Sequence, residues 1–156
     1  MSKSTINICI PVFNEEKNIH KLYEDLKIKI LDLEKKYDMI LKIVFFDDGS
    51  SDNSRQILEK LENIELLYVD ENKGLGNAIR ELCMHSKETG VNGMFKVDGD
   101  GQMDLDDLNK FLENDMHKNK DVIYGNRFHK SSNYKMPLHR RLPKRGFNSL
   151  QNKREI

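Results

Sequence analysis

The feature that most constrains the fold of this chain is a regular alternation of strand-like and helix-like segments. Between Lys17 and Tyr37, apolar residues recur every three or four positions, which is the spacing of one buried helix face. Strand-like runs occupy residues 6–13, 41–46, 65–69, 94–97 and 121–124, and helix-like stretches occupy residues 17–37, 52–61, 76–88 and 105–112. This order predicts an α/β fold with a mostly parallel sheet and helices on both faces.

Polar residues follow four of the five strand-like runs. They are Asn14-Glu15, Asp47-Asp48, Asn72-Lys73 and Asp98-Gly99-Asp100. The carboxyl ends of parallel strands share one edge of the sheet, and ligands of such sheets bind beyond that edge. The sequence therefore predicts one crevice into which all four groups project.

The segment Asp98-Gly99-Asp100-Gly101-Gln102 places two carboxylates two residues apart at a strand end. Hard oxygen ligands of this kind suit Mg²⁺ or Mn²⁺, which often bridge carboxylates to substrate phosphates. A calcium-binding loop does not fit, because Met103 stands where the loop needs glycine and Asn109 where it needs a bidentate glutamate. A turn capped by its own aspartate side chains remains the structural alternative.

Two further turns carry polar groups. Asp47 and Asp48 end a buried strand, and Asp52 is expected to cap the following helix. Two adjacent carboxylates exceed what a cap needs, so one of them is a candidate acceptor for a nucleobase or ribose. Residues 72–78 resemble a dinucleotide-binding turn only in part, because Ile79 replaces its last small residue. This turn remains able to approach a phosphate.

The formal net charge of zero conceals two regions of opposite charge. Residues 1–126 hold 17 Lys and Arg against 25 Asp and Glu, whereas residues 127–156 hold 9 Lys and Arg against the single acid Glu155. We divide the chain into a body, residues 1–128, and a basic tail, residues 129–156. The tail predicts contact with an anionic membrane surface, a solvated tail being the alternative. The acidic body argues against nucleic acid.

No stretch approaches the 18 or so consecutive apolar residues of a membrane span, and the N-terminus has no signal-peptide pattern. The two cysteines, Cys9 and Cys83, fall in a predicted strand and a predicted helix, which does not indicate a disulfide scaffold. These observations predict a cytoplasmic protein, with the basic tail placing it at the cytoplasmic face of a membrane.

Four segments in this order resemble family 2 glycosyltransferases, whose nucleotide-sugar-binding domain has the Rossmann-like GT-A fold. The segments are Pro11-Val12-Phe13-Asn14-Glu15-Glu16, Asp47-Asp48-Gly49-Ser50-Ser51-Asp52, Asp98-Gly99-Asp100-Gly101-Gln102 and Tyr124-Gly125-Asn126-Arg127-Phe128. The glutamine after the second aspartate and the Gly-x-Arg-Phe element look most like the dolichyl-phosphate mannose synthase and polyprenyl-phosphate glucosyltransferase branch. The body, residues 1–128, would be the nucleotide-sugar-binding domain, and the tail would begin an incomplete acceptor region.

The resemblance implies a role for each matching residue. Nucleotide-binding residues would be Pro11, Phe13, Glu15, Asp47, Asp48 and Lys73; metal ligands would be Asp98 and Asp100; phosphate-binding residues would be Arg127 and Arg141; and the catalytic group would be Asp98, Asp100, Gln102 and Arg127. The family usually has tyrosine at the position of Phe13, so a hydroxyl contact there is lost.

The implied activity is an inverting, metal-dependent transfer of a hexose from a GDP- or UDP-sugar to a polyprenyl phosphate, either dolichyl or undecaprenyl. Alternatives are transfer to a cell-surface polysaccharide and a catalytically silent nucleotide-sugar-binding module. Family domains of this branch usually continue well beyond this length. The resemblance therefore implies C-terminal truncation, and an exposed edge where later elements would pack predicts self-association.

Overall fold

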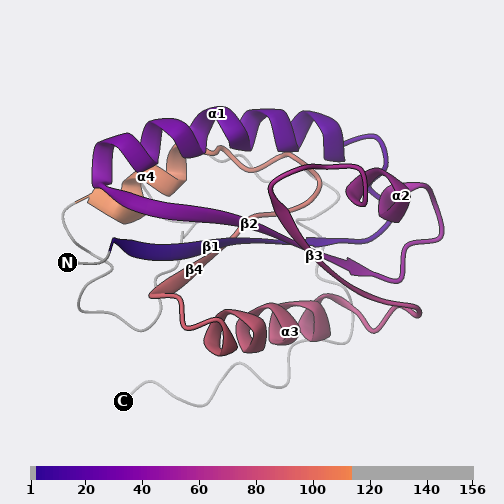
Figure 1. Cartoon of the computed structure of the whole chain (residues 1–156). Helices are drawn as coiled ribbons and strands as arrows, with labels where there is room; N and C mark the ends of the chain where they lie inside the picture. The colour runs from indigo at the N-terminus through magenta and orange to yellow at the C-terminus, as the bar shows by residue number, and fades with distance from the viewer. Residues whose placement is uncertain (1–2, 114–156) are drawn as a thin grey trace, which may run out of the picture. The chain divides into compact units, whose positions relative to one another are not determined.

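The computed structural model describes residues 3–113, which form a parallel sheet covered by helices on both faces (Figure 1). The elements in chain order are β1 (Ser4–Val12), α1 (Ile19–Tyr37), β2 (Met39–Asp48), α2 (Ser54–Leu58), β3 (Ile64–Val69), α3 (Leu75–Glu88), β4 (Gly93–Lys96) and α4 (Asp106–Leu112). The sheet order is β3-β2-β1-β4, with every neighbouring pair parallel. The predicted α/β fold is confirmed, while the predicted strand at 121–124 lies outside the described residues.

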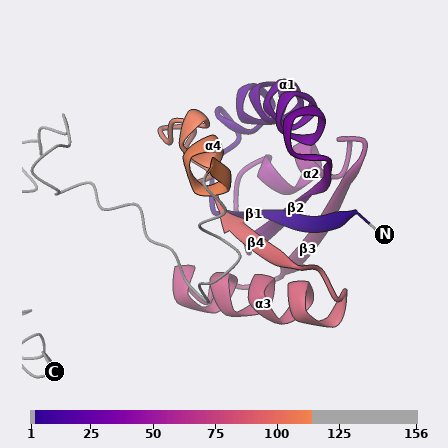
Figure 2. The same ribbon diagram turned by 90° about the vertical axis from the view of Figure 1, so that its left-hand side faces the viewer.

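Two apolar layers sandwich the sheet. One face of β1 and β2 packs with α1, α2 and α4, and Phe45, Leu26 and Leu108 are almost fully buried there. The opposite face packs against α3 through a smaller group that includes Cys9, Val44 and Leu82. Figure 2 shows α3 alone beneath the sheet and α1 and α4 together above it. Both faces of the central strands are thus apolar, as the continuous hydrophobic runs of β1 and β2 predict.

Helix α1 buries the face that its sequence spacing predicts. Ile19, Leu22, Leu26, Ile30 and Leu33 are all buried. The helix ends at Tyr37, and Asp38 then takes a left-handed conformation with φ 49°, which lets the chain turn back into β2.

The start of α2 differs from the prediction. Asn53, not Asp52, is the N-cap residue, and it makes no side-chain capping bond. The Asp52 carboxylate lies one position earlier, where it accepts hydrogen bonds from the N–H groups of Ser54 (2.9 Å) and Glu16 (3.1 Å). The Asp52 carboxylate therefore still accepts from the first amide of α2, and it also binds the loop after β1.

Both cysteine thiols are free. Burial raises the pKa of the Cys9 thiol to about 11, so this thiol stays protonated and unreactive at neutral pH. None of the helices in the described part of the chain combines the length and apolar character that a bilayer span requires.

Candidate functional site

The loops that follow β1 and β2 are tied together by side chain to backbone hydrogen bonds. The Asn14 side-chain oxygen accepts from the N–H groups of Ser51 (2.8 Å) and Asp52 (3.3 Å). The Asn14 N–H in turn donates to the Ser50 hydroxyl oxygen at 3.0 Å. Asn14 has φ 56°, a left-handed conformation that asparagine tolerates better than most residues. The loops 13–16 and 49–54 therefore form one unit, which we call the double loop.

Further bonds run across the double loop in both directions. The Glu15 N–H donates to the Ser54 hydroxyl oxygen at 2.8 Å, and the Asn53 N–H donates to the Glu16 carboxylate at 3.1 Å. Burial acts to raise the pKa of Asp52, but the hydrogen bonds from Ser54 and Glu16 outweigh it and hold that pKa below its ordinary value. The acidic Asp52 is thus an ionised acceptor at neutral pH that holds both strand ends.

The loop between β3 and α3, residues 70–74, is anchored to the end of β2 by Asp48. One oxygen of the buried Asp48 carboxylate accepts from the Lys73 N–H (3.0 Å) and the other from the Gly74 N–H (2.8 Å). Gly49 has φ +69°, and a Cβ added there would lie 2.6 Å from the backbone nitrogen of Asn72. Only glycine therefore allows the loop to pass this close.

Asp47 is fully buried and faces Arg55 of α2. Its carboxylate accepts from the Arg55 Nε at 2.8 Å and from the Ser50 N–H at 3.2 Å. The hydrogen bond to Asp47 raises the pKa of the Arg55 guanidinium above its ordinary value. The role of Asp47 and Asp48 toward a nucleotide stays a prediction. In this structure both carboxylates bind neighbouring protein groups.

The Asp98-Gly99-Asp100 segment leaves the end of β4 close to β1. A Cβ on Gly99 would lie 2.7 Å from the backbone oxygen of Pro11, so this glycine is required for the approach of the two strand ends. The Asp98 carboxylate pairs with Lys96, and the exposed Asp100 carboxylate accepts only from the N–H of Gln102, at 3.0 Å, among the bonds of residues 3–113. This segment is much less bonded than the double loop.

The two carboxylates of this segment suit a Mg²⁺ or Mn²⁺ ion. Water molecules and substrate phosphate would supply most of the other ligands of such an ion. Asp98 and Asp100 supply hard carboxylate oxygens at the exposed edge. Within residues 3–113, no three acidic, histidine or cysteine side chains converge into a ready cation cage. The two aspartates would therefore hold an ion together with a ligand rather than alone.

Most of the predicted residues lie along the carboxyl edge of the sheet. Pro11, Asp47, Asp48, Lys73 and the Asp98–Asp100 segment are brought there by three strand ends and by the loop before α3. The Phe13 side chain is 45% exposed, and the Glu15 carboxylate accepts from the Asn18 amide at 2.6 Å. Arg127 and Arg141 lie outside the described residues.

Two residues of this edge hold its loops in ways that the sequence does not predict. Asn14 lies in the first of the four motifs. Its left-handed backbone and the three hydrogen bonds that its side-chain oxygen accepts show why asparagine suits this position. Arg55 gives no signal in the sequence, because a lone arginine on a short helix is usually a solvated surface residue.

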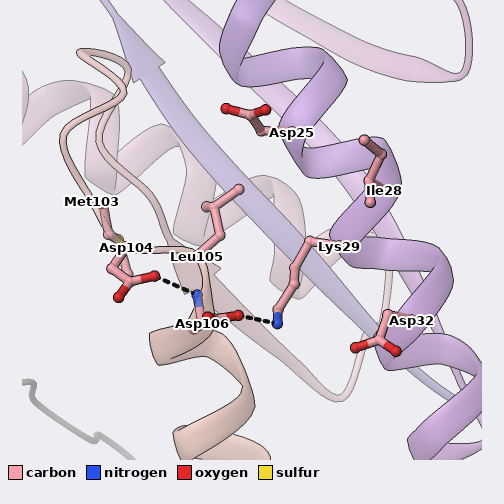
Figure 3. Close-up of a pocket in the computed structure, with 8 residues that line it drawn as sticks. All are labelled: Asp25, Ile28, Lys29, Asp32, Met103, Asp104, Leu105 and Asp106. Atoms are coloured by element: carbon pink, nitrogen blue, oxygen red, sulfur yellow. Dashed lines mark hydrogen bonds and ion pairs between the residues drawn. The ribbon is translucent and has the colours of Figure 1, made fainter.

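A surface hollow lies away from this edge, between the middle of α1 and the residues that precede α4 (Figure 3). It is lined by Asp25, Ile28, Lys29 and Asp32 of α1 and by residues 103–106. Lys29 bonds to the Asp106 carboxylate at 2.5 Å, which ties the two walls together. The hollow contains none of the strand-end residues, so we do not assign the candidate site to it.

Comparison with known proteins places the chain in a family. The family model for glycosyl transferase family 2 matches residues 7–155. The chain belongs to this family. A UDP-N-acetylglucosamine–dolichyl-phosphate N-acetylglucosaminyltransferase of Methanococcus voltae is 27% identical over 96% of this chain and 63% of its own length. A dolichyl-phosphate beta-glucosyltransferase of Trichomonas vaginalis is 32% identical over 76% of this chain and 38% of its own length.

Other family members are similar over shorter stretches. An undecaprenyl-phosphate 4-deoxy-4-formamido-L-arabinose transferase of Proteus mirabilis is 34% identical over 65% of this chain and 28% of its own length. The crystal structure of S. aureus TarS 1–349 in complex with UDP has 26% identity and a TM-score of 0.50, covering 70% of this chain and 32% of that one. The chain thus spans 63% or less of the length of each protein compared here.

Proposed function

We propose that this chain binds a nucleotide-sugar at the carboxyl edge of its sheet, as part of an enzyme that transfers a hexose to a polyprenyl phosphate. The observation that carries the proposal is the meeting of the double loop and the Asp98–Asp100 segment at one edge, where Gly99 fits against the backbone of Pro11. Relatives named as dolichyl-phosphate and undecaprenyl-phosphate transferases, and a neighbour solved with UDP, support this choice of donor and acceptor.

In this proposal two parts of the edge bind different portions of the donor. The double loop and the loop 70–74 receive the nucleoside, because the hydrogen bonds of Asn14 and Asp48 hold their backbone before a ligand arrives. Asp98 and Asp100 would hold Mg²⁺ or Mn²⁺ at the part of the edge that receives the diphosphate. When bound, the ion stabilises the negative charge that develops on the leaving diphosphate.

The proposed transfer breaks one bond and forms another at the anomeric carbon. An oxygen of the acceptor phosphate attacks in line and inverts the configuration, and the bond to the nucleoside diphosphate breaks with its electron pair. A phosphate monoester has a second pKa of about 6, so it is largely ionised at neutral pH and requires no strong general base. We expect Arg127 and Arg141 to contact phosphate, because the planar guanidinium binds phosphate oxygens in pairs.

Calorimetric titration with UDP, GDP and their sugars, with and without Mn²⁺, tests donor binding. We expect one nucleoside diphosphate to bind and Mn²⁺ to strengthen its binding by about tenfold or more, equivalent to at least 1.4 kcal/mol or so. Asp100→Ala should remove this gain, whereas the exposed Asp32→Ala on α1 should retain it. Binding that is independent of metal and unchanged in Asp100→Ala would refute the role of the aspartate pair.

A radiolabelled donor assay with a short-chain polyprenyl phosphate tests the acceptor. We expect slow movement of label into the lipid fraction, and none into a polysaccharide acceptor. Transfer needs both reactants in near-attack positions, which is worth about 7–11 kcal/mol, so it depends on acceptor contacts far more than donor binding does. Efficient labelling of polysaccharide instead of lipid would replace the proposed acceptor.

A further inference from the structure

Arg55 connects three groups at the ends of β2 and β3. Its Nε donates to the buried Asp47 carboxylate at 2.8 Å, and its Nη1 donates to Asp70 at 3.2 Å. Its Nη2 donates to the backbone oxygen of Val69. The guanidinium carbon also lies 4.4 Å from the ring centre of Tyr68, a side chain that is 57% exposed. One side chain thus contacts β2, the end of β3 and the first residue of the loop 70–74.

The loop 70–74 is therefore held at both of its ends. Arg55 holds the Val69–Asp70 end, and the Asp48 carboxylate holds the N–H groups of Lys73 and Gly74 at the other. The backbone between them lies directly over Gly49. A loop fixed in this way presents the exposed Lys73 side chain from a backbone of defined position.

Arginine suits this task better than lysine. Its nitrogens lie in one rigid plane, so each can meet a different partner while the face of the plane rests on an aromatic ring. A lysine keeps the positive charge beside Asp47 but has a single nitrogen, which cannot reach Asp47, Asp70 and Val69 together. Replacing Arg55 with lysine therefore tests the hold on the loop while it keeps the positive charge beside Asp47.

We propose that Arg55 is a positioning residue for the donor nucleotide, holding the loop 70–74 so that Lys73 meets the ligand in one orientation. The proposal rests on the proposed nucleotide site, but the hold on the loop is a separate property of the free protein. Arg55 does not itself touch the ligand, so its effect is transmitted through the loop.

The test compares Arg55→Lys with Arg80→Lys, a matched change at an exposed arginine of α3 that pairs with its neighbour Glu81. Hydrogen exchange of the amides of residues 70–74 measures the loop without ligand. We expect faster exchange of these amides in Arg55→Lys, and wild-type exchange in Arg80→Lys. Unchanged protection of the loop in Arg55→Lys would overturn the proposal. If Arg55→Lys does not fold, Asp70→Asn removes one arm of the hold and carries the same test.

Titration with UDP then connects the loop to the ligand. We expect Arg55→Lys to weaken UDP binding by about tenfold, the effect of losing a hydrogen bond to a charged group. In a Lys73→Ala background the same change should cost less than about twofold, because coupled residues are not additive. Equal losses in both backgrounds would overturn the route through Lys73. If wild-type protein binds no nucleoside diphosphate, the proposed function fails, and hydrogen exchange alone decides the hold on the loop.

Discussion

The double loop and the Asp98–Asp100 segment occupy the same edge of the sheet but are built differently. In the double loop, Asn14, Glu16 and Asp52 each bond across to the facing loop. In the Asp98–Asp100 segment, each carboxylate bonds to a residue two positions away in sequence, Lys96 or Gln102. The side chains of the first region bond across long sequence distances, whereas the carboxylates of the second bond only locally, although Gly99 packs against the backbone of Pro11.

This difference indicates which part of the edge depends on a ligand for its order. A backbone that is already held loses little conformational freedom when a nucleoside binds, which favours affinity. Two carboxylates with few partners are suited to a cation, because their lone pairs remain available. We therefore expect the double loop to govern stability and the Asp98–Asp100 segment to govern metal-assisted binding.

The largest expected effect on stability follows from Gly49→Ala. The new Cβ would lie 2.6 Å from the backbone of the loop 70–74, and the residue has φ +69°. Overpacking and left-handed strain together predict a loss of about 3 kcal/mol in the free energy of unfolding. Urea denaturation measures it.

Gly101→Ala, directly after the Asp98–Asp100 segment, is the matched control for Gly49. Its φ is +67°, but a Cβ there meets no atom within 4 Å. We expect a loss of about 1 kcal/mol, from strain alone. Equal losses at the two glycines would mean that the double loop is no more tightly built than the aspartate segment.

Asn14→Ala should have the next largest effect. It removes the acceptor for the N–H groups of Ser51 and Asp52 and places alanine at φ 56°. We expect a loss of about 2 kcal/mol, again by urea denaturation. Asn63→Ala serves as the control, because Asn63 has φ 55° and an exposed side chain. A loss at Asn63 as large as that at Asn14 would assign the effect to backbone strain instead of the bonds across the loops.

The sequence predicts the regular parts of this fold and the location of the site, but not the contacts that hold the site. The spacing in α1 and the apolar runs of β1 and β2 are local patterns, and the structure confirms them. The strand-end motifs converge because parallel strands share an edge. The partnership of Arg55 with Val69 depends on tertiary packing, which local propensity does not contain. Asp52 shows the same limit, because its bond to the Glu16 N–H joins two loops that are far apart in the sequence.

Asp52 also gives the double loop a pH dependence. The hydrogen bonds from Ser54 and Glu16 hold its pKa below the ordinary 3.8 despite the opposing effect of burial. The ionised form is therefore favoured in the folded state, so its contribution is complete above pH 3.8 and is lost as the pH falls through the lower folded pKa.

Asp52→Asn should remove that contribution, about 1 kcal/mol at neutral pH. Unfolding measured from pH 6 to pH 2 should show a smaller acid-induced loss in Asp52→Asn than in wild-type protein. Asp106→Asn provides a comparison outside the double loop, since Lys29 lowers the pKa of the Asp106 carboxyl at the start of α4. Parallel acid profiles for wild-type protein and Asp52→Asn would contradict a role for Asp52 in holding the loops.

The smallest expected effect on stability is that of Asp100→Ala. The Asp100 carboxylate is exposed, and its hydrogen bond spans only two residues to the Gln102 N–H at 3.0 Å. Surface changes without buried partners usually alter stability by less than about 0.5 kcal/mol, so Asp100→Ala should unfold at nearly the wild-type urea concentration. The same variant should nevertheless lose the Mn²⁺-dependent gain in nucleoside diphosphate binding. A loss of stability close to that of Asn14→Ala would instead show that the Asp98–Asp100 segment is as tightly held as the double loop. In that case the Asp100 carboxylate would stabilise the folded edge as well as serve the ligand.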